Sequence, residues 1–289
     1  MWGLKVNLCN EVVRELDFAA QCAFARNHGF DGLEVAPFTL AADPTRMTAA
    51  QIAGLRDIAA SEGTRISGLH WLLAAPSGLS ITSDDHITFE ATCDAGQRLI
   101  DLCASLGGTY LVHGSPNQRE LRPGDEAIGR RQAITYLARM AQSASDHGVS
   151  YILEPLARDT TNFAASVDEA VAIVDEIGSP ALQTMIDCYA LAANGDDVAA
   201  ALDAWLAQGR VAHVHFNDDN MGGPGQGAID FAAVIETLRK HRFAGQTAIE
   251  PFVYEPDGPA CASASIRFIR SLERREFSTS SAARIAPEI

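Results

Sequence analysis

The stretch VAHVHFNDDNMGGPGQG, residues 211–227, combines a strand pattern, two histidines and a glycine-rich loop. Alternate residues of a strand point to opposite faces. His213 and His215 therefore share one face, while Val214 and Phe216 lie on the other. The apolar face suits packing against helices, whereas two imidazoles on one face are unusual for an ordinary core strand. The pattern predicts a barrel strand whose inward face ends in a functional site.

Three other short apolar runs end in a side chain that can bind a metal. YILEPL supplies Glu154, LQTMIDC supplies Asp187 and QTAIEPF supplies Glu250. Three carboxylates and the His215 imidazole suit a six-coordinate divalent cation. Mn²⁺ is favoured, with Mg²⁺ or Co²⁺ as alternatives. A structural zinc site would instead favour thiolate ligands. A carboxylate that caps a neighbouring helix explains any one of these residues. It explains four residues at matching strand ends poorly.

Eight strand-then-helix units follow one another along the chain. We expect strands at 4–10, 32–37, 65–73, 109–116, 151–156, 182–188, 211–217 and 246–252. A helix is expected after each strand, the first over 11–28 and the last over 262–274, with Asp230 capping the helix after strand seven. Such repeats favour a parallel sheet, and eight of them close a (β/α)₈ barrel. An open doubly wound sheet is the alternative, but the first turn, NLCNEVV, lacks the glycines typical of it.

The predicted fold is therefore α/β, a single (β/α)₈ TIM barrel over residues 1–275. A polar tail follows at 276–289, which we expect to be mobile or to pack on a partner subunit.

The composition indicates a globular cytoplasmic protein. No apolar run approaches a membrane span, and residues 1–10 lack the apolar core of a secretory signal. The six cysteines are scattered without zinc-type pairing, which indicates reduced thiols. A formal net charge of −15 argues against a nucleic-acid partner. We expect a small-molecule substrate and no membrane partner. A homo-oligomer is compatible with the sequence.

Further polar residues lie at or near the predicted strand ends. Candidate substrate contacts are Glu34, His70, Trp71, His113 and Arg158. His213 lies one layer deeper than His215 and is expected to support His215 by a hydrogen bond. His213 is also a candidate substrate contact. Arg119 is interpreted as a solvated loop charge. The loop GGPGQG lacks the spacing of a phosphate-binding motif.

Four segments, EPLARDTTNF, IDCY, HVHFND and IEPF, resemble the xylose isomerase-like barrel superfamily of sugar phosphate isomerases and epimerases. The resemblance covers nearly the whole chain and is strongest to the tagatose/psicose 3-epimerase branch. It implies that Glu154, Asp187, His215 and Glu250 bind the metal. It also implies that Glu154 and Glu250 form the acid/base pair beside the sugar carbonyl. The superfamily also includes an AP-endonuclease branch, which binds DNA and has a multi-zinc site with more histidines. The acidic net charge and the single quartet of this chain argue against that branch.

Three positions depart from the 3-epimerase pattern. Ala190 stands where those enzymes have a histidine, Met221 where they have an arginine, and Thr160 where they have a glutamate. The pocket for one end of a free ketohexose is therefore altered. We expect poor activity on tagatose, fructose and psicose, and better activity on a differently shaped or modified keto-sugar.

The sequence thus predicts a divalent-metal-dependent sugar isomerase or epimerase. It would act on a keto-sugar or sugar derivative by proton transfer through a metal-stabilised enediolate. Two alternatives remain open. A metal-dependent dehydratase or lyase on a keto-sugar or inositol derivative begins with the same proton abstraction, and its product distinguishes it. A non-catalytic sugar-binding barrel would show no exchange of solvent deuterium into bound sugar.

Overall fold

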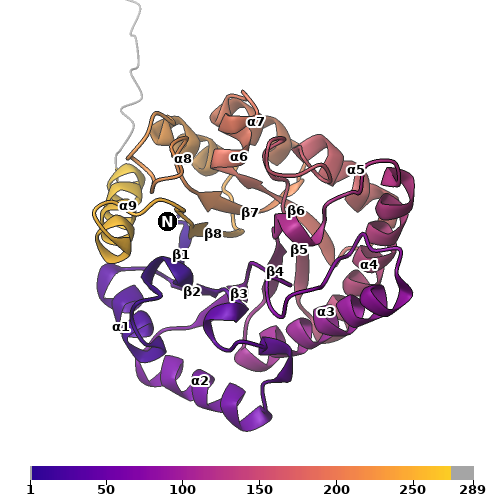
Figure 1. Ribbon diagram of the computed structural model, residues 1–289. Helices are drawn as coiled ribbons and strands as arrows, with labels where there is room; N and C mark the ends of the chain where they lie inside the picture. Colours follow the sequence, from indigo (N-terminus) through magenta and orange to yellow (C-terminus); the bar gives the residue numbers. More distant parts are fainter. Residues whose placement is uncertain (1, 275–289) are drawn as a thin grey trace, which may run out of the picture.

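A computed structural model describes residues 2–274 and forms a closed barrel of parallel strands in chain order (Figure 1). The strands are β1 (Lys5–Cys9), β2 (Gly32–Val35), β3 (Ile66–Leu69), β4 (Tyr110–His113), β5 (Ser150–Leu153), β6 (Leu182–Asp187), β7 (Val211–Phe216) and β8 (Gln246–Ile249). β1 pairs with both β2 and β8, with Asn7 opposite Gly32 and Ala248. The predicted eight-stranded barrel is confirmed, and the open sheet is excluded. The predicted tail, residues 276–289, lies outside the described residues.

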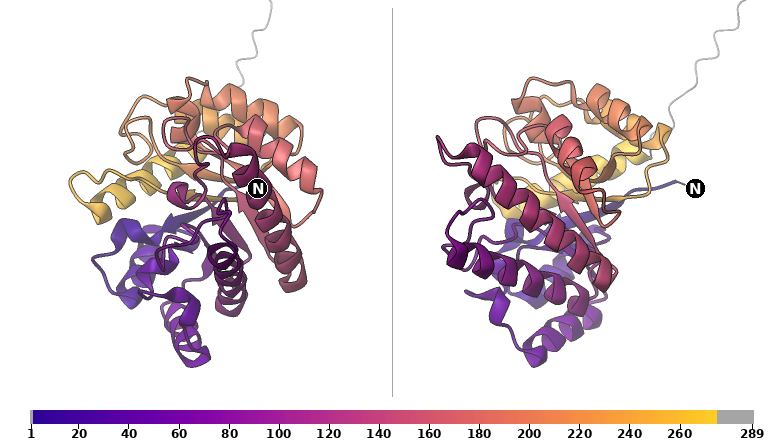
Figure 2. Two further views of the ribbon diagram at one scale, coloured as in Figure 1. Left: turned by 45° about the vertical axis from the view of Figure 1, so that its right-hand side comes forward. Right: turned by 90° about the vertical axis from the view of Figure 1, so that its right-hand side faces the viewer.

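Helices surround the barrel in a ring (Figure 1). They are α1 (Phe18–His28), α2 (Ala49–Ser61), α3 (His86–Leu106), α4 (Glu126–His147), α5 (Val167–Ile177), α6 (Cys188–Ala193), α7 (Val198–Ala207), α8 (Phe231–Lys240) and α9 (Gly258–Glu273). Short 3₁₀ turns lie at η1 (Asn10–Val13), η2 (Pro37–Thr39), η3 (Pro44–Arg46) and η4 (Pro116–Gln118). Figure 2 shows α3 and α4 running side by side on the outside of the barrel. None of the helices within 2–274 is long and apolar enough to span a membrane.

Side-chain caps determine where several helices begin. Asp230 accepts a hydrogen bond from the Ala233 amide at 3.1 Å, as predicted for the start of α8. The single helix predicted over 11–28 is wrong, because Asp17 has an extended backbone and caps α1, which leaves η1 as a separate turn. Helix α6 was not predicted. It begins directly after β6, where Asp187 caps it by accepting from the Ala190 amide at 2.7 Å.

Strand alternation separates two apolar layers. Val214 and Phe216 of β7 join the large core between strands and helices. A smaller cluster, Tyr110, Val112, Ile152 and Met185, fills part of the barrel interior. The ring of His213 lies 4.9 Å from that of Tyr110, so the histidine face of β7 points inward. The apolar face of β7 therefore packs on helices and its imidazoles enter the barrel, as the alternation predicts.

Candidate metal centre and active site

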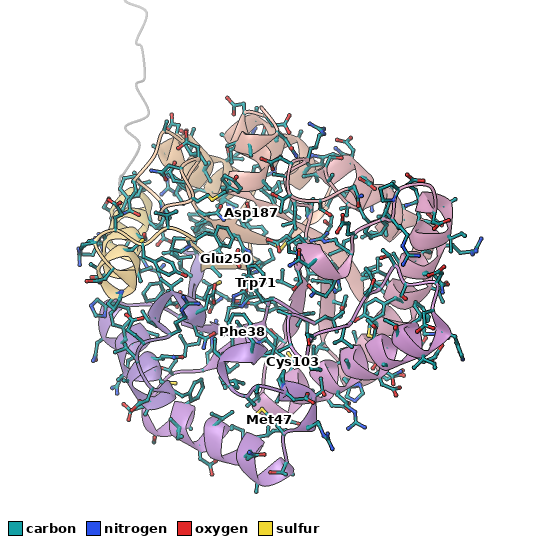
Figure 3. All side chains as sticks on the ribbon, in the orientation of Figure 1. Phe38, Met47, Trp71, Cys103, Asp187 and Glu250 are labelled. Atoms are coloured by element: carbon teal, nitrogen blue, oxygen red, sulfur yellow. The ribbon has the colours of Figure 1, made fainter. Side chains whose placement is uncertain are left out.

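Four side chains from successive strands converge at the C-terminal end of the barrel. Each of Glu154, Asp187, His215 and Glu250 offers a ligand atom within 4.8 Å of the others, and all four residues are buried. Nδ1 of His215 lies 2.8 Å from Oε2 of Glu250, 3.1 Å from Oε1 of Glu154 and 4.0 Å from Oδ2 of Asp187. Figure 3 shows Asp187 and Glu250 over the middle of the barrel. The quartet singled out in the sequence is thus brought together.

Glu34 of β2 fixes the orientation of the His215 ring. Its Oε1 lies 2.8 Å from Nε2 of His215, and its Oε2 accepts a hydrogen bond of 2.5 Å from the Tyr110 hydroxyl. Nε2 of His213 lies 3.1 Å from the same Oε2. Burial opposes ionisation of Glu34, but His213 and His215 hold its pKa well below the usual range. A carboxylate on one ring nitrogen leaves the other nitrogen directed at the quartet, as in carboxylate–histidine–metal arrangements.

The carboxylates of the quartet repel one another. Burial and the neighbouring Glu154 raise the pKa of Asp187 to about 6. Burial raises the pKa of Glu250 to about 8, with His215 opposing the shift and Glu154 adding to it. Bound divalent cations are commonly the largest local charge in such a site and stabilise ionised carboxylates. Oxygen-rich donors with one imidazole suit Mn²⁺, Mg²⁺ or Co²⁺. The residues present therefore fit a divalent cation.

A second buried pair lies beside Glu250. Nε2 of His70 lies 2.8 Å from Oε2 of Glu11 and 3.7 Å from Oε1 of Glu250. Burial would lower the pKa of His70, but Glu11 and, more weakly, Glu34 and Glu250 raise it to about 9. The ring is therefore positively charged at neutral pH and faces a candidate base. The sequence singled out His70 and missed Glu11, which lies in η1 beyond the end of β1.

Arg119 holds the main chain that carries Glu154. Its guanidinium is fully buried and donates to the carbonyl oxygens of Glu154 at 2.7 Å and Gly114 at 2.8 Å. Burial lowers the pKa of Arg119 to about 10, so the side chain stays charged at neutral pH. The interpretation of Arg119 as a solvated loop charge is wrong. Its charge is stabilised by backbone carbonyl dipoles rather than by water.

His113 and Arg158 are placed away from the quartet. His113 lies on the helix side of β4, where its Nδ1 is 2.8 Å from the Tyr151 hydroxyl and its ring faces Tyr136 of α4. Burial and Arg119 lower the pKa of His113 to about 3, so the ring is neutral. The structure contradicts the predicted substrate contact for His113, because strand alternation turns this side chain outward. Arg158 is exposed and does not line the cavity above the quartet.

A cavity of about 190 Å³ opens above the quartet and reaches Glu154, Asp187 and Glu250. Trp71, the only other candidate contact among its lining residues within 2–274, forms part of the wall. The three positions that depart from the 3-epimerase pattern line the same cavity: Thr160, Ala190 and Met221. Glu34, His70 and His213 lie behind the quartet rather than in the cavity wall. Glu34 and His213 contact His215, and His70 lies 3.7 Å from Oε1 of Glu250, so each of the three contacts the quartet.

Gly114 provides a specific test of the Glu154 position. A Cβ at residue 114 would lie 1.7 Å from Oε2 of Glu154, the mobile end of that side chain. We expect Gly114→Ala to displace the carboxylate and to lower Mn²⁺ affinity at least about tenfold, the range seen when support of a metal ligand is lost. Thermal unfolding should change little, because the clash is relieved by rotating one side chain.

Gly54→Ala is the matched control, since its added Cβ meets nothing within 4 Å in helix α2. Titration calorimetry with Mn²⁺ and thermal melts of both variants measure the two effects. Wild-type metal affinity in Gly114→Ala would contradict the placement of Glu154 beside the cation.

Comparison with known proteins gives one family match and several similar proteins. The model of the family described as xylose isomerase-like TIM barrel matches residues 22–272. An L-ribulose 3-epimerase from Methylomonas sp. (strain DH-1) is 27% identical over 194 residues, covering 63% of this chain and 64% of that protein. A ketose 3-epimerase from Arthrobacter globiformis is 29% identical over 199 residues, covering 65% of this chain and 68% of that protein.

Solved structures share the fold. The D-psicose 3-epimerase from Clostridium cellulolyticum H10, solved with D-tagatose, superimposes with a TM-score of 0.80 at 19% identity, covering 93% of this chain and 99% of that chain. At this identity the likeness concerns the fold alone. The match of the family model over most of the chain is the stronger finding. The chain belongs to the xylose isomerase-like TIM barrel family.

Proposed function

We propose that this protein is a divalent-metal-dependent epimerase or isomerase that moves a proton next to the carbonyl of a keto-sugar or sugar derivative. The observation that supports it most directly is the pair Glu154 and Glu250. Both carboxylates reach the same cavity, and both lie within 3.1 Å of one imidazole nitrogen. The names of the relatives, L-ribulose 3-epimerase and ketose 3-epimerase, support the same reaction class.

Glu154, Asp187, His215 and Glu250 would hold the cation, with Mn²⁺ favoured by the mixed oxygen and nitrogen donors. When bound, such an ion polarises the sugar carbonyl and makes the neighbouring C–H more acidic. Glu34 keeps Nδ1 of His215 directed at the site.

The two glutamates divide the proton transfer. Glu154 follows β5 and Glu250 follows β8, so they approach the cavity from different sides. One carboxylate removes the proton, and the other returns a proton to the opposite face of the same carbon, which inverts it. Return of the proton to the neighbouring carbon would give isomerisation. Burial raises the pKa of Glu250, and His70, whose Nε2 lies 3.7 Å from Oε1 of Glu250, opposes that shift and so favours the ionised carboxylate.

Deuterium exchange tests the proposal directly. The Mn²⁺-loaded protein, incubated with a panel of keto-sugars in D₂O, is expected to replace the hydrogen next to the carbonyl with deuterium, and ¹H NMR follows the loss of signal. Chelation of the metal should stop the exchange. An epimer or an aldose–ketose partner is the expected product.

Other outcomes identify the alternatives. An unsaturated or ring-opened product would replace the proposal with dehydratase or lyase activity. Binding of sugar without any exchange would indicate a non-catalytic binding barrel.

A further inference from the structure

Three large side chains of the cavity lining, Trp71, Met221 and Phe252, form a wall at the mouth of the cavity. The rings of Trp71 and Phe252 meet edge to face with centroids 6.4 Å apart, and the ring of Phe38 also meets Trp71 edge to face at 6.4 Å. Phe252 is 41% exposed and Met221 is 37% exposed, which is unusual for large apolar side chains beside a polar site. Figure 3 shows Trp71, Glu250 and Asp187, which line the same cavity, over the barrel centre.

The backbone holds this wall in a defined shape. Trp71 and Met221 have φ values of 50° and 62°, a left-handed conformation that bulky residues rarely adopt. The carbonyl oxygen of Met221 accepts hydrogen bonds from the amides of Phe252 at 2.8 Å and Val253 at 2.9 Å. These bonds join the loop after β7 to the loop after β8. Strained backbone that is held in this way clusters at ligand sites.

The charges of the cavity disfavour a phosphorylated ligand. Within residues 2–274, the lining contains no lysine, arginine or histidine, and its charged groups are the carboxylates Glu154, Asp187 and Glu250. Phosphate recognition normally uses arginine, lysine or backbone amides. A phosphate on the outer end of a sugar would lie against Met221 and Phe252 without a charged partner, and would lose hydration there.

The cavity is large enough for a sugar but not for a sugar together with a large substituent. A volume of about 190 Å³ is below the roughly 300–1,000 Å³ typical of sites for drug-sized ligands. A sugar that reaches Glu154 and Glu250 would therefore fill the interior. Any group attached to its outer end would lie in the mouth, against Trp71, Met221 and Phe252.

We propose that the substrate is an uncharged sugar derivative with an apolar or aromatic substituent, such as a keto-glycoside with an aryl aglycone, whose substituent packs on the Trp71–Met221–Phe252 wall. This inference rests on the proposed function for the position of the sugar end. Packing of the substituent on this wall would supply binding affinity. A free sugar cannot gain that affinity from Thr160 and Ala190, which stand where the 3-epimerases have a glutamate and a histidine.

Equilibrium binding tests the wall without requiring turnover. Titration calorimetry on the Mn²⁺-loaded protein compares 4-nitrophenyl glucoside, methyl glucoside and glucose 6-phosphate. We expect the aryl glycoside to bind at least about tenfold more tightly than the methyl glycoside, because an aromatic ring leaves water for an aromatic surface. Phe252→Ser should reduce this preference to less than about threefold.

Val253→Ser is the matched control, because Val253 is a 44% exposed neighbour outside the cavity lining. It should retain the full aryl preference. Equal binding of the two glycosides, no measurable binding of the aryl glycoside, or tighter binding of the sugar phosphate would each overturn the inference. Loss of the preference in Val253→Ser as well as in Phe252→Ser would also overturn it, since the effect would then not depend on the wall.

Exchange in D₂O separates this inference from the proposed function. Faster exchange with an aryl keto-glycoside than with free tagatose, fructose or psicose supports both. Equal or faster exchange with the free ketohexoses overturns the substrate class and leaves the isomerase or epimerase activity standing. Aryl preference in binding, without exchange on any keto-sugar, supports the wall and overturns the activity.

Discussion

Glu250→Gln and Glu154→Gln are each expected to lower kcat at least about 10³-fold, since positioned acid–base groups contribute roughly 10²- to 10⁴-fold. Glutamine keeps an oxygen that can bind a cation but cannot accept the substrate proton at neutral pH. Metal occupancy should therefore survive better than activity. Steady-state kinetics and metal analysis of the same protein samples measure the two properties separately.

The two variants should differ in deuterium exchange. If one glutamate removes the proton and the other returns it, one variant can still exchange the substrate proton with D₂O while failing to invert the carbon. Glu255→Gln is the control, because Glu255 is an exposed carboxylate on the loop after β8 and does not line the cavity. Full activity in both Glu154→Gln and Glu250→Gln would exclude the two-base mechanism, even with the metal site intact.

The barrel and the quartet could be predicted because both depend on local rules. Each strand is a short apolar run, and each of Glu154, Asp187, His215 and Glu250 lies in or directly after such a run. In a parallel barrel the carboxyl ends of all strands meet at one face. Alternation then determines which side chains point inward. No long-range contact needs to be known for this inference.

His113 shows where alternation fails as a guide. The run YLVH of β4 is buried on both faces, with Leu111 in the helix-facing core and Tyr110 and Val112 inside the barrel. Parallel strands that are covered on both sides show no polar face in their sequence. The inward direction could therefore not be read from β4 alone, and the predicted contact was placed on the wrong side.

Contacts made by residues in or beside turns could also not be predicted from the sequence. Glu11 meets His70 across 59 residues of chain, and Arg119 meets the Glu154 carbonyl across 35. Glu11 lies in the 3₁₀ turn η1 and Arg119 directly follows η4, and the direction of such turns depends on packing rather than on a periodic pattern. A buried arginine that donates to backbone carbonyls has no sequence signature, since its partners are present in every residue.

His215→Ala is expected to abolish Mn²⁺ binding, whereas His213→Ala should weaken it by roughly tenfold or more through the support it gives to a metal ligand. His215 is the single imidazole of the quartet, so its removal takes away the nitrogen donor of the proposed site. His213 contacts the site through Glu34, which lies 3.1 Å from its Nε2 and 2.8 Å from Nε2 of His215, and through the His215 ring, whose centroid lies 4.8 Å from its own.

The ranking of the two histidine variants distinguishes a ligand from a residue that orients one. His86→Ala is the control, because the His86 side chain is 86% exposed at the start of α3. Titration calorimetry with Mn²⁺ gives the affinities, and circular dichroism verifies that each variant is folded. Without His215 the nitrogen donor and its fixed direction are lost, and we expect no measurable Mn²⁺ binding by the three remaining carboxylates. Wild-type affinity in folded His215→Ala would exclude this quartet as the metal site, and a larger loss in His213→Ala than in His215→Ala would assign the ligand role to the deeper histidine.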